Sequence, residues 1–234
     1  MPSTNTSAQP EDNNPPHQAD TSQLVDPPLS AAVTGIDALA AKGVQRRFGT
    51  NTLLIQEGDV GNTLYIVISG KLRVFAADDK GKEVTLSVVG PGDYVGEMTL
   101  DGGLRSACVQ TLAPTVCSVV TRDMLREHIA NDPDFAFEMM SRLIRRARLA
   151  TESVRSLALI DTYGRLARLL EQMAVPHTDG TRIIAERVTH QDLANHVACS
   201  REMVSRLLKD LETGGYLTVV ERKLVLMKPL PARW

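Results

Sequence analysis

A change in hydrophobic periodicity near residue 121 is the feature that most constrains the fold of this 234-residue chain. Between residues 44 and 121, apolar side chains come in short runs, among them TLYIVI, KLRVFA and EVTLSVV, and glycines separate these runs. Many short strands joined by glycine turns are typical of a β-sandwich or barrel. After residue 121 the apolar residues recur at helical spacing instead. The sequence therefore predicts an α+β protein whose β-domain precedes its helices.

The same textures divide the chain into four predicted parts. Residues 1–28 contain 6 of the 12 prolines and few side chains that can be buried, which predicts a disordered tail. Residues 29–132 form the β-domain, opened by a short helix over residues 29–42, and residues 133–160 form one long helix. Residues 161–234 form a C-terminal domain. The chain has no apolar run of about 18 residues and no secretory signal, so we expect a soluble, cytoplasmic protein without a membrane partner.

The long helix carries an apolar seam with heptad spacing. Successive members are separated by 4, 3, 4, 3, 4 and 3 residues: Ala136, Met140, Leu143, Ala147, Ala150, Val154 and Leu157. A seam of this kind is typical of a parallel coiled coil, and charged residues flank it. The alternative is a helix that lies with this face on its own core. We favour the coiled coil, and we predict a homodimer with these residues at its interface.

The C-terminal part has the order helix, turn, helix, β-hairpin. A helix over YGRLARLLEQMA is followed by the polar segment HTDGTR, which we expect to be a loop. Two further helical patterns meet at a turn near residues 198–200, and two strands lie around residues 221–223. This order predicts a winged helix-turn-helix. Residues 161–234 carry a net charge of +2, against −4 for residues 1–160, and this small difference points to the C-terminal part as the DNA-binding part.

Caps and buried stripes orient the two helices of this motif. Thr189, with Asp192 three residues later, is expected to cap the first helix, whose inward residues are Leu193, His196 and Val197. Ser200 is expected to cap the second helix, which buries Val204, Leu207, Leu208 and Leu211. Its outward face, including the cap, then carries the candidate DNA-binding residues Ser200, Arg201, Glu202, Ser205, Arg206 and Lys209.

The outward residues have the chemistry of base recognition. Arginine forks match the O6 and N7 acceptors of guanine, and a glutamate accepts from the N4 donor of cytosine. The alternative is a solvated helix face with a local salt bridge between Glu202 and Arg206.

The β-domain contains a second candidate site in the segment GEMTLDGGLRSA, residues 96–107. A short helical turn after Gly96 can present amide groups to an anion, Arg105 supplies a positive charge for a phosphate, and Glu97 can accept a hydrogen bond from a sugar hydroxyl. These residues also fit a β-hairpin with an Arg–Glu pair, so that alternative stays open.

Five features follow one another along the chain: the segment LLIQEGDVGNTLYIVISGKLRVF, then GDYVGEM, LRSA, the long helix and THQDLANHVACSREMVSRLLKDLE. Taken together, they resemble the Crp-Fnr family of bacterial transcription regulators. Within it, the resemblance is to the branch of cyclic-AMP receptor proteins, and it covers about residues 30–230. It implies a jelly-roll-like β-roll as sensor, a dimerisation helix and a winged helix-turn-helix. It also implies that Gly96, Glu97, Arg105 and Ser106 bind the ribose and cyclic phosphate, and that Arg201, Glu202 and Arg206 read a TGTGA-type half-site.

The chain departs from that pattern on the long helix. Receptor proteins present Thr then Ser to the adenine, whereas this chain has Ala150 then Thr151, so only Thr151 is carried over as an effector-binding residue. The predicted ligand is cyclic AMP or another cyclic nucleotide; the alternatives are cyclic di-GMP or no ligand. The resemblance further implies RNA polymerase as a partner of the DNA-bound dimer.

The function classes that remain are few. A nucleotide-binding module that regulates a partner protein is the alternative from another class. No nucleophile–base pairing or metal spacing suggests an enzyme or a metal site. Three scattered cysteines, Cys108, Cys117 and Cys199, are expected to be buried, reduced thiols.

Overall fold

The computed structural model describes residues 35–177 and 180–231. The predicted tail, residues 1–28, lies outside this range, and so do residues 29–34 of the predicted first helix. Within the described ranges, no helix is both long enough and apolar enough to cross a membrane.

The β-domain consists of two four-stranded antiparallel sheets. Their strands are β1 (Val44–Phe48), β2 (Leu53–Ile55), β3 (Thr63–Ser69), β4 (Leu72–Ala77), β5 (Glu83–Val89), β6 (Tyr94–Val95), β7 (Cys108–Thr111) and β8 (Thr115–Thr121). One sheet has the order β1-β8-β3-β6 and the other β2-β7-β4-β5. Strands adjacent in sequence thus belong to different sheets at several points, as in a jelly roll. The predicted α+β class with an N-terminal β-roll is confirmed.

Alternation along β3 shows how two apolar layers form around one sheet. Val67 packs in a cluster with Leu72 of β4 and Val109 of β7, between the two sheets. Leu64 and Ile66, which point to the opposite face, belong to a second cluster beneath the helices. Because successive side chains of a strand point to opposite faces, this single apolar strand contributes to both layers.

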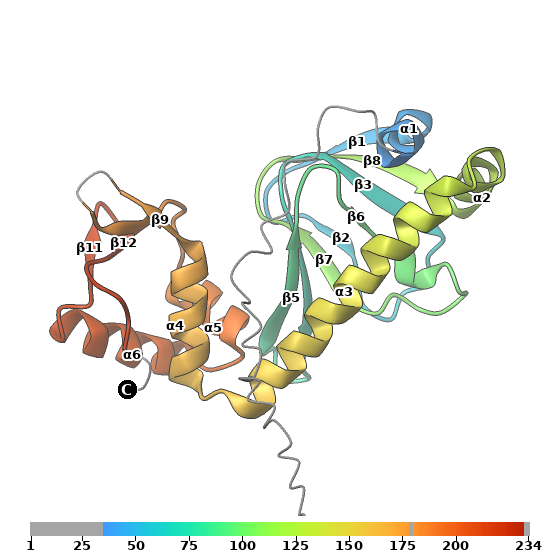
Figure 1. Ribbon diagram of the computed structural model, residues 1–234. Helices are drawn as coiled ribbons and strands as arrows, with labels where there is room; N and C mark the ends of the chain where they lie inside the picture. The colour runs from blue at the N-terminus through green and yellow to red at the C-terminus, as the bar shows by residue number, and fades with distance from the viewer. Residues whose placement is uncertain (1–34, 178–179, 232–234) are drawn as a thin grey trace, which may run out of the picture. The chain divides into compact units, whose positions relative to one another are not determined.

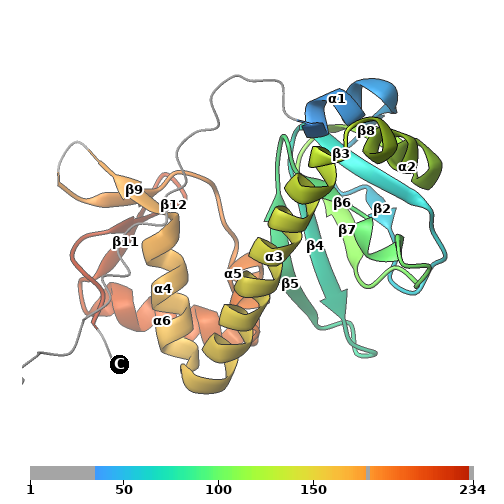
Figure 2. The same ribbon diagram turned by 45° about the vertical axis from the view of Figure 1, so that its right-hand side comes forward.

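Three helices cover the second cluster (Figures 1 and 2). They are α1 (Gly35–Lys42), α2 (Arg122–Asn131) and α3 (Asp134–Leu159). The Thr121 side chain caps α2 by accepting from the Met124 amide. Phe135 and Met139 bury the first turns of α3 in this cluster, and the later turns run along the strands of the β-domain. The beginning of α3 is therefore anchored by apolar packing.

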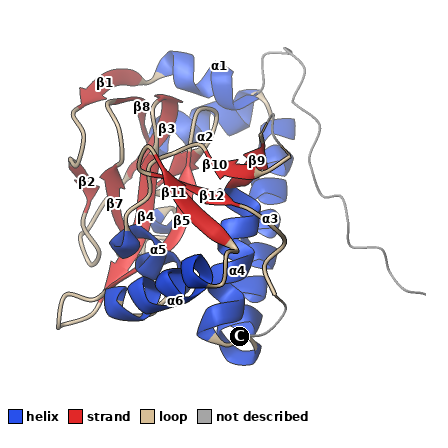
Figure 3. Ribbon diagram, turned by 90° about the vertical axis from the view of Figure 1, so that its left-hand side faces the viewer, coloured by secondary structure: helices blue, strands red, loops and turns tan. Residues whose placement is uncertain are grey.

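The C-terminal part has its own core and its own sheet. It contains α4 (Thr162–Met173), β9 (Ala174–Pro176), β10 (Arg182–Ile184), α5 (His190–Val197), α6 (Arg201–Thr213), β11 (Leu217–Val220) and β12 (Lys223–Leu226). The strands, red in Figure 3, form an antiparallel sheet in the order β11-β12-β10-β9. The predicted winged helix-turn-helix is confirmed. The predicted loop HTDGTR connects β9 to β10, a strand pair that the sequence analysis did not predict, and its last residue, Arg182, already belongs to β10.

The turn between α5 and α6 is well defined by its caps. Thr189 and Asp192 form a reciprocal capping box, as predicted, and Ser200 caps α6 by accepting from the Met203 amide. Ala198 has φ of 54° and ends α5 in the left-handed region, which redirects the chain into α6.

The prediction that His196 faces inward is wrong. Its imidazole is exposed and its Nδ1 lies 2.8 Å from the Asp192 carbonyl oxygen. Asn195 is buried in the same turn, and its side-chain oxygen accepts from Gln191. Leu193 and Val197 are buried as predicted, so the buried face of α5 includes Asn195 in place of His196.

Candidate functional site

The turn that begins at Gly96 requires a glycine. Gly96 has φ of 94° and precedes the single 3₁₀ turn η1 (Glu97–Thr99). A Cβ atom at this position would lie 2.5 Å from Nη1 of Arg105 and 2.7 Å from the carbonyl oxygen of Thr63. Both the left-handed backbone and the close approach of Arg105 exclude a side chain here.

Arg105 is buried and held by oxygen atoms of the β-domain. It is 7% exposed. Its Nη1 donates to the Gly96 carbonyl at 3.0 Å, and its Nη2 donates to the carbonyl and hydroxyl oxygens of Thr63 at 2.9 and 3.1 Å. No carboxylate balances its charge among the described residues, so the guanidinium is a fixed positive centre. This geometry contradicts the alternative of an Arg–Glu pair within the segment.

A cavity of about 240 Å³ lies against this turn. Its charged lining residues are Glu97, Arg105 and Arg146, and much of the remaining wall is apolar. The residues that line it come from the strands, the turn and α3: Ile55, Val74, Leu86, Ser87, Val89, Val95, Gly96, Glu97, Met98, Thr99, Arg105, Ser106, Ala107, Val109, Arg146, Leu149, Ala150 and Ser153.

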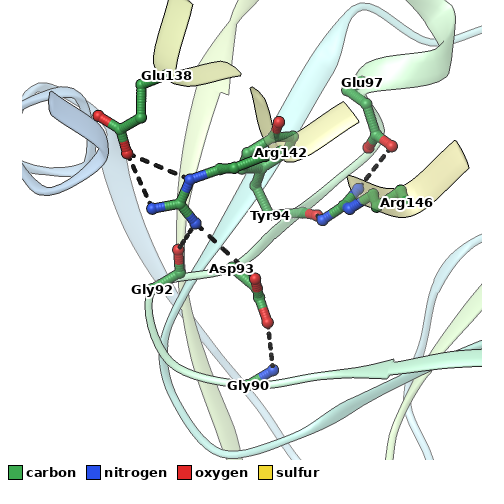
Figure 4. Close-up of polar contacts among 8 residues, drawn as sticks. All are labelled: Gly90, Gly92, Asp93, Tyr94, Glu97, Glu138, Arg142 and Arg146. Atoms are coloured by element: carbon green, nitrogen blue, oxygen red, sulfur yellow. Dashed lines mark hydrogen bonds and ion pairs between the residues drawn. The ribbon is translucent and has the colours of Figure 1, made fainter. Parts of the chain in front are cut away.

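An ion pair joins α3 to the turn at the edge of this cavity (Figure 4). Nη1 of Arg146 lies 2.6 Å from Oε1 of Glu97, and Nη2 donates to the carbonyl of Tyr94 at 2.6 Å. The guanidinium also lies 4.6 Å from the centre of the Tyr94 ring, a cation–π distance. The Glu97 side chain is only 10% exposed, so its charge needs this partner or a replacement for it.

Arg142, one turn earlier on α3, contacts the segment before β6 (Figure 4). Its Nη1 donates to the Gly92 carbonyl at 2.9 Å and lies 3.9 Å from Oδ1 of Asp93. Its Nη2 pairs with Glu138 of the same helix at 2.9 Å. Arginines on two consecutive turns of α3 thus donate to the backbone carbonyls of Gly92 and Tyr94 in one segment.

The ring of Tyr94 packs against the guanidinium of Arg146. The side chain is fully buried, and among the described residues its hydroxyl has no hydrogen-bond partner. Burial raises the pKa of this hydroxyl above its usual value.

The outward face of α6 carries the predicted DNA-binding side chains. Arg201, Glu202, Arg206 and Lys209 are exposed, and Ser205 is half-buried with its hydroxyl 2.8 Å from Nδ1 of His190. Hydrogen bonds from its own backbone amide and from the Ser200 hydroxyl lower the pKa of the Glu202 carboxyl, so this side chain is an ionised acceptor. The stripe of Val204, Leu207, Leu208 and Leu211 is buried as predicted.

Comparison with known proteins matches both parts of the chain to described families. Residues 45–132 match the cyclic nucleotide-binding domain, and residues 187–217 match the crp family of bacterial regulatory proteins. The cAMP-activated global transcriptional regulator CRP of Salmonella typhimurium is 33% identical over 189 residues, which cover 77% of this chain and 88% of CRP. The chain belongs to the Crp family. The similar regulator Vfr of Pseudomonas aeruginosa is 31% identical over 82% of this chain and 92% of Vfr.

Solved structures agree with this family assignment. The c-di-GMP responsive global regulator CLP of Xanthomonas campestris is 29% identical, with a TM-score of 0.75 over 83% of this chain and 98% of CLP. A CRP/FNR-family regulator of Thermus thermophilus shares the fold, with a TM-score of 0.66 and 23% identity over 79% of this chain and 94% of that protein. The Crp-family chain is therefore a DNA-binding transcription regulator with a cyclic nucleotide-binding domain.

Four of the five predicted effector residues of this Crp-family regulator line the cavity, namely Gly96, Glu97, Arg105 and Ser106. Thr151 does not line it; this side chain is exposed, and its hydroxyl donates to the Ala147 carbonyl at 3.0 Å.

Sequence reasoning missed the contribution of Arg146, Leu149 and Ser153. Their spacing of three, four and seven residues places them on one helix face, a signal that the sequence contains. The sequence does not say which face of the helix meets the cavity.

The apolar seam of α3 in the Crp-family chain is exposed to a large extent. Met140, Val154 and Leu157 are 46%, 67% and 49% exposed, and Leu143 is 38% exposed. Two apolar side chains that the predicted seam omits, Phe137 and Ile144, are 66% and 54% exposed beside it. The alternative in which α3 buries this seam on its own core is therefore wrong for the part of the chain described here.

None of the three cysteines lines the cavity. Cys108 and Cys117 are buried and Cys199 is half-buried, and all three are free. Within residues 35–177 and 180–231 there is no cluster of three or more His, Cys, Asp or Glu side chains that could hold a metal ion.

Proposed function

We propose that this Crp-family regulator binds cyclic AMP in the cavity between the β-roll and α3. The observation that carries the proposal is that Arg105 and Glu97 line one cavity, the first as a fixed cation for a phosphate and the second as an acceptor for a ribose hydroxyl. Gly96 and Ser106 complete the phosphate-binding turn. Thr151 lies outside the cavity of its own chain, so we assign it to the ligand from the partner helix of a dimer.

The charge of the cavity supports a cyclic mononucleotide. Two arginines and one glutamate line it, which gives a net charge of +1. A cyclic phosphodiester carries one negative charge and balances this set, whereas a phosphate monoester at neutral pH carries nearly two. Charge-assisted hydrogen bonds from Arg105 then hold the phosphate in place.

Cyclic di-GMP is the second candidate ligand. It is favoured by the likeness to CLP, whose structure describes a c-di-GMP responsive regulator. Its two phosphates need more cations than this cavity offers, and the further arginines of α3, such as Arg148 and Arg155, are exposed. A regulator that needs no ligand is the remaining alternative.

We further propose that α6 reads a TGTGA-type palindrome. Arg201, Glu202 and Arg206 lie in the first two turns of α6, and the opposite face of this helix is buried. The first turns of a recognition helix are the part that meets base edges. Ser200, Ser205 and Lys209 flank these residues and are assigned to the DNA backbone. A palindrome has twofold symmetry, so the proposal requires two recognition helices.

The proposed assembly is a homodimer joined along α3. Its parts are a sensor over residues 29–132, the dimerisation helix over residues 133–160 and the DNA-binding domain over residues 161–234. The interface consists of Ala136, Met140, Leu143, Ala147, Ala150, Val154 and Leu157. Such a dimer acts in the cytoplasm on double-stranded DNA together with RNA polymerase, without membrane attachment and without enzymatic activity.

The ion pair of Arg146 and Glu97 connects ligand binding to α3 in this proposal. A ribose hydroxyl that bonds to Glu97 competes with Arg146 for the carboxylate. The attachment of α3 to the sensor then changes, which biases the angle between sensor and DNA-binding domains and shifts an existing population.

Calorimetric titration of the full chain with cyclic AMP, cyclic GMP and cyclic di-GMP tests the effector. We expect cyclic AMP to bind most tightly. Fluorescence anisotropy on a TGTGA palindrome, with and without the bound nucleotide, tests the readout, and we expect the nucleotide to tighten binding. Preferential binding of cyclic di-GMP would make cyclic di-GMP, in place of cyclic AMP, the effector of this regulator. Binding of cyclic AMP without any DNA binding would favour a module that regulates a partner protein.

A further inference from the structure

The face of α3 that meets the cavity has polar side chains only at its two ends. It consists of Arg146, Leu149, Ala150 and Ser153. Seven residues separate the first from the last, and at a rise of about 1.5 Å per residue this is about 10 Å along the helix. Arg146 is fixed at the Glu97 end, so Ser153 lies about two turns farther along, past Leu149 and Ala150.

The hydrogen bond that the Ser153 hydroxyl makes within α3 determines whether this hydroxyl donates to a ligand or accepts from it. Its Oγ donates to the Leu149 carbonyl at 3.0 Å, the i−4 bond that serines commonly make in helices. The proton is therefore engaged within α3, while the lone pairs of the oxygen remain available. Ser153 thus acts toward the cavity as a hydrogen-bond acceptor.

We infer that Ser153 is a specificity-determining residue that accepts a hydrogen bond from an exocyclic amino group of the nucleobase. The inference rests on the proposed function. A nucleotide with its phosphate at Arg105 and its ribose at Glu97 extends its base along α3, between apolar side chains such as Val74, Leu86 and Leu149 that line the same cavity. Ser153 then supplies, one helical turn later, the hydroxyl that is missing at Ala150.

The chemistry of this acceptor distinguishes adenine from hypoxanthine. Adenine presents a 6-amino donor, whereas hypoxanthine presents a 6-oxo acceptor in the same place. A 6-oxo group can pair with Ser153 only if the serine gives up its bond to Leu149. The site therefore favours cyclic AMP over cyclic inosine monophosphate, two ligands with the same ribose and the same phosphate.

Titration of the full-length protein with these two nucleotides tests the inference. In Ser153→Ala we expect the affinity for cyclic AMP to fall by about twofold to tenfold, the value of one neutral hydrogen bond. The affinity for cyclic inosine monophosphate should stay within about twofold. Ser156→Ala is the matched control, because this half-buried serine of the same helix does not line the cavity and should change neither affinity.

The outcomes separate this inference from the proposal beneath it. Normal binding of cyclic AMP by the unmodified chain, with equal changes for both ligands in Ser153→Ala or no change in either, would overturn the inference alone. Failure of the unmodified chain to bind either nucleotide would overturn the proposed effector, and the assignment of Ser153 with it.

Discussion

Arg105 is the residue on which the effector proposal depends most, because the protein already holds its guanidinium in place through Gly96 and Thr63. Removal of the guanidinium in Arg105→Ala takes away a charge-assisted hydrogen bond worth about 1.5 to 3 kcal/mol. The affinity for cyclic AMP should therefore fall by about tenfold to more than a hundredfold in calorimetric titration.

Arg105→Lys separates this effect from damage to the fold. The lysine keeps the charge but cannot bond to Gly96 and Thr63 in the same fork geometry. We expect the affinity of this variant for cyclic AMP to lie between those of the unmodified protein and Arg105→Ala. The midpoint of thermal unfolding, measured without ligand, reports how much stability is lost with the bonds to Gly96 and Thr63. Unchanged affinity in a folded Arg105→Ala protein would show that the phosphate lies elsewhere.

Cys117 gives a prediction for the pH dependence. Burial raises the pKa of its thiol from 9 to about 11. The folded chain then holds this proton more tightly than the unfolded chain, so the contribution to the free energy of unfolding falls as the pH rises from 9 toward 11. At pH 8, alkylation followed by peptide mass spectrometry should label the half-buried Cys199 well before Cys117. Comparable labelling of Cys117 and Cys199 in the native protein would contradict this prediction. Comparable labelling that occurs only in denaturant would agree with it.

At the scale of the element, α6 is the part whose role is most directly testable. Arg206→Ala should relax the preference for one base of each half-site, because a bidentate arginine–guanine pair carries about 1 to 3 kcal/mol of discrimination. Anisotropy titrations against half-sites substituted at single positions measure this. Lys209→Ala is the control, since loss of a backbone contact weakens all sequences alike. Uniform weakening in Arg206→Ala would make it a phosphate contact instead.

Elements with clear periodicity could be predicted from sequence, and those fixed by partners could not. The bounds of α3 agree with the prediction to within one residue at each end, because its apolar spacing is a local feature. In contrast, β6 contains only two residues, and β9 and β10 contain three each. Strands this short exist because a neighbouring strand pairs with them, and no local pattern marks them.

The candidate site divides in the same way. Gly96, Glu97, Arg105 and Ser106 lie within eleven residues of sequence, so their common chemistry was visible there. Arg146 meets Glu97 from 49 positions away. The choice among the arginines of α3 depends on the rotation of the helix, which Phe135 and Met139 set by packing beneath it. Tertiary packing, rather than local sequence, therefore decides which cation completes the cavity.

For the whole molecule, the exposed seam of α3 predicts a stable twofold dimer. An apolar surface of this length is costly to leave in water, and a second copy offers the same seam in return. Light scattering at micromolar concentration should give the mass of a dimer, and Leu143→Asp should shift it toward the monomer. Val60→Asp is the matched control, because Val60 is 88% exposed and lies outside α3. A monomeric unmodified chain would contradict the predicted assembly.

A single helix of 26 residues has a consequence for how such a regulator can change over evolution. On α3, the cavity residues Leu149, Ala150 and Ser153 lie next to the seam residues Ala147 and Val154, and Ala150 belongs to both sets. A substitution that adapts the base end to a new signal therefore changes side chains next to the proposed subunit contact. Gains in selectivity should arise together with altered subunit affinity, and second-site changes that restore one property should recur at positions adjacent to the first.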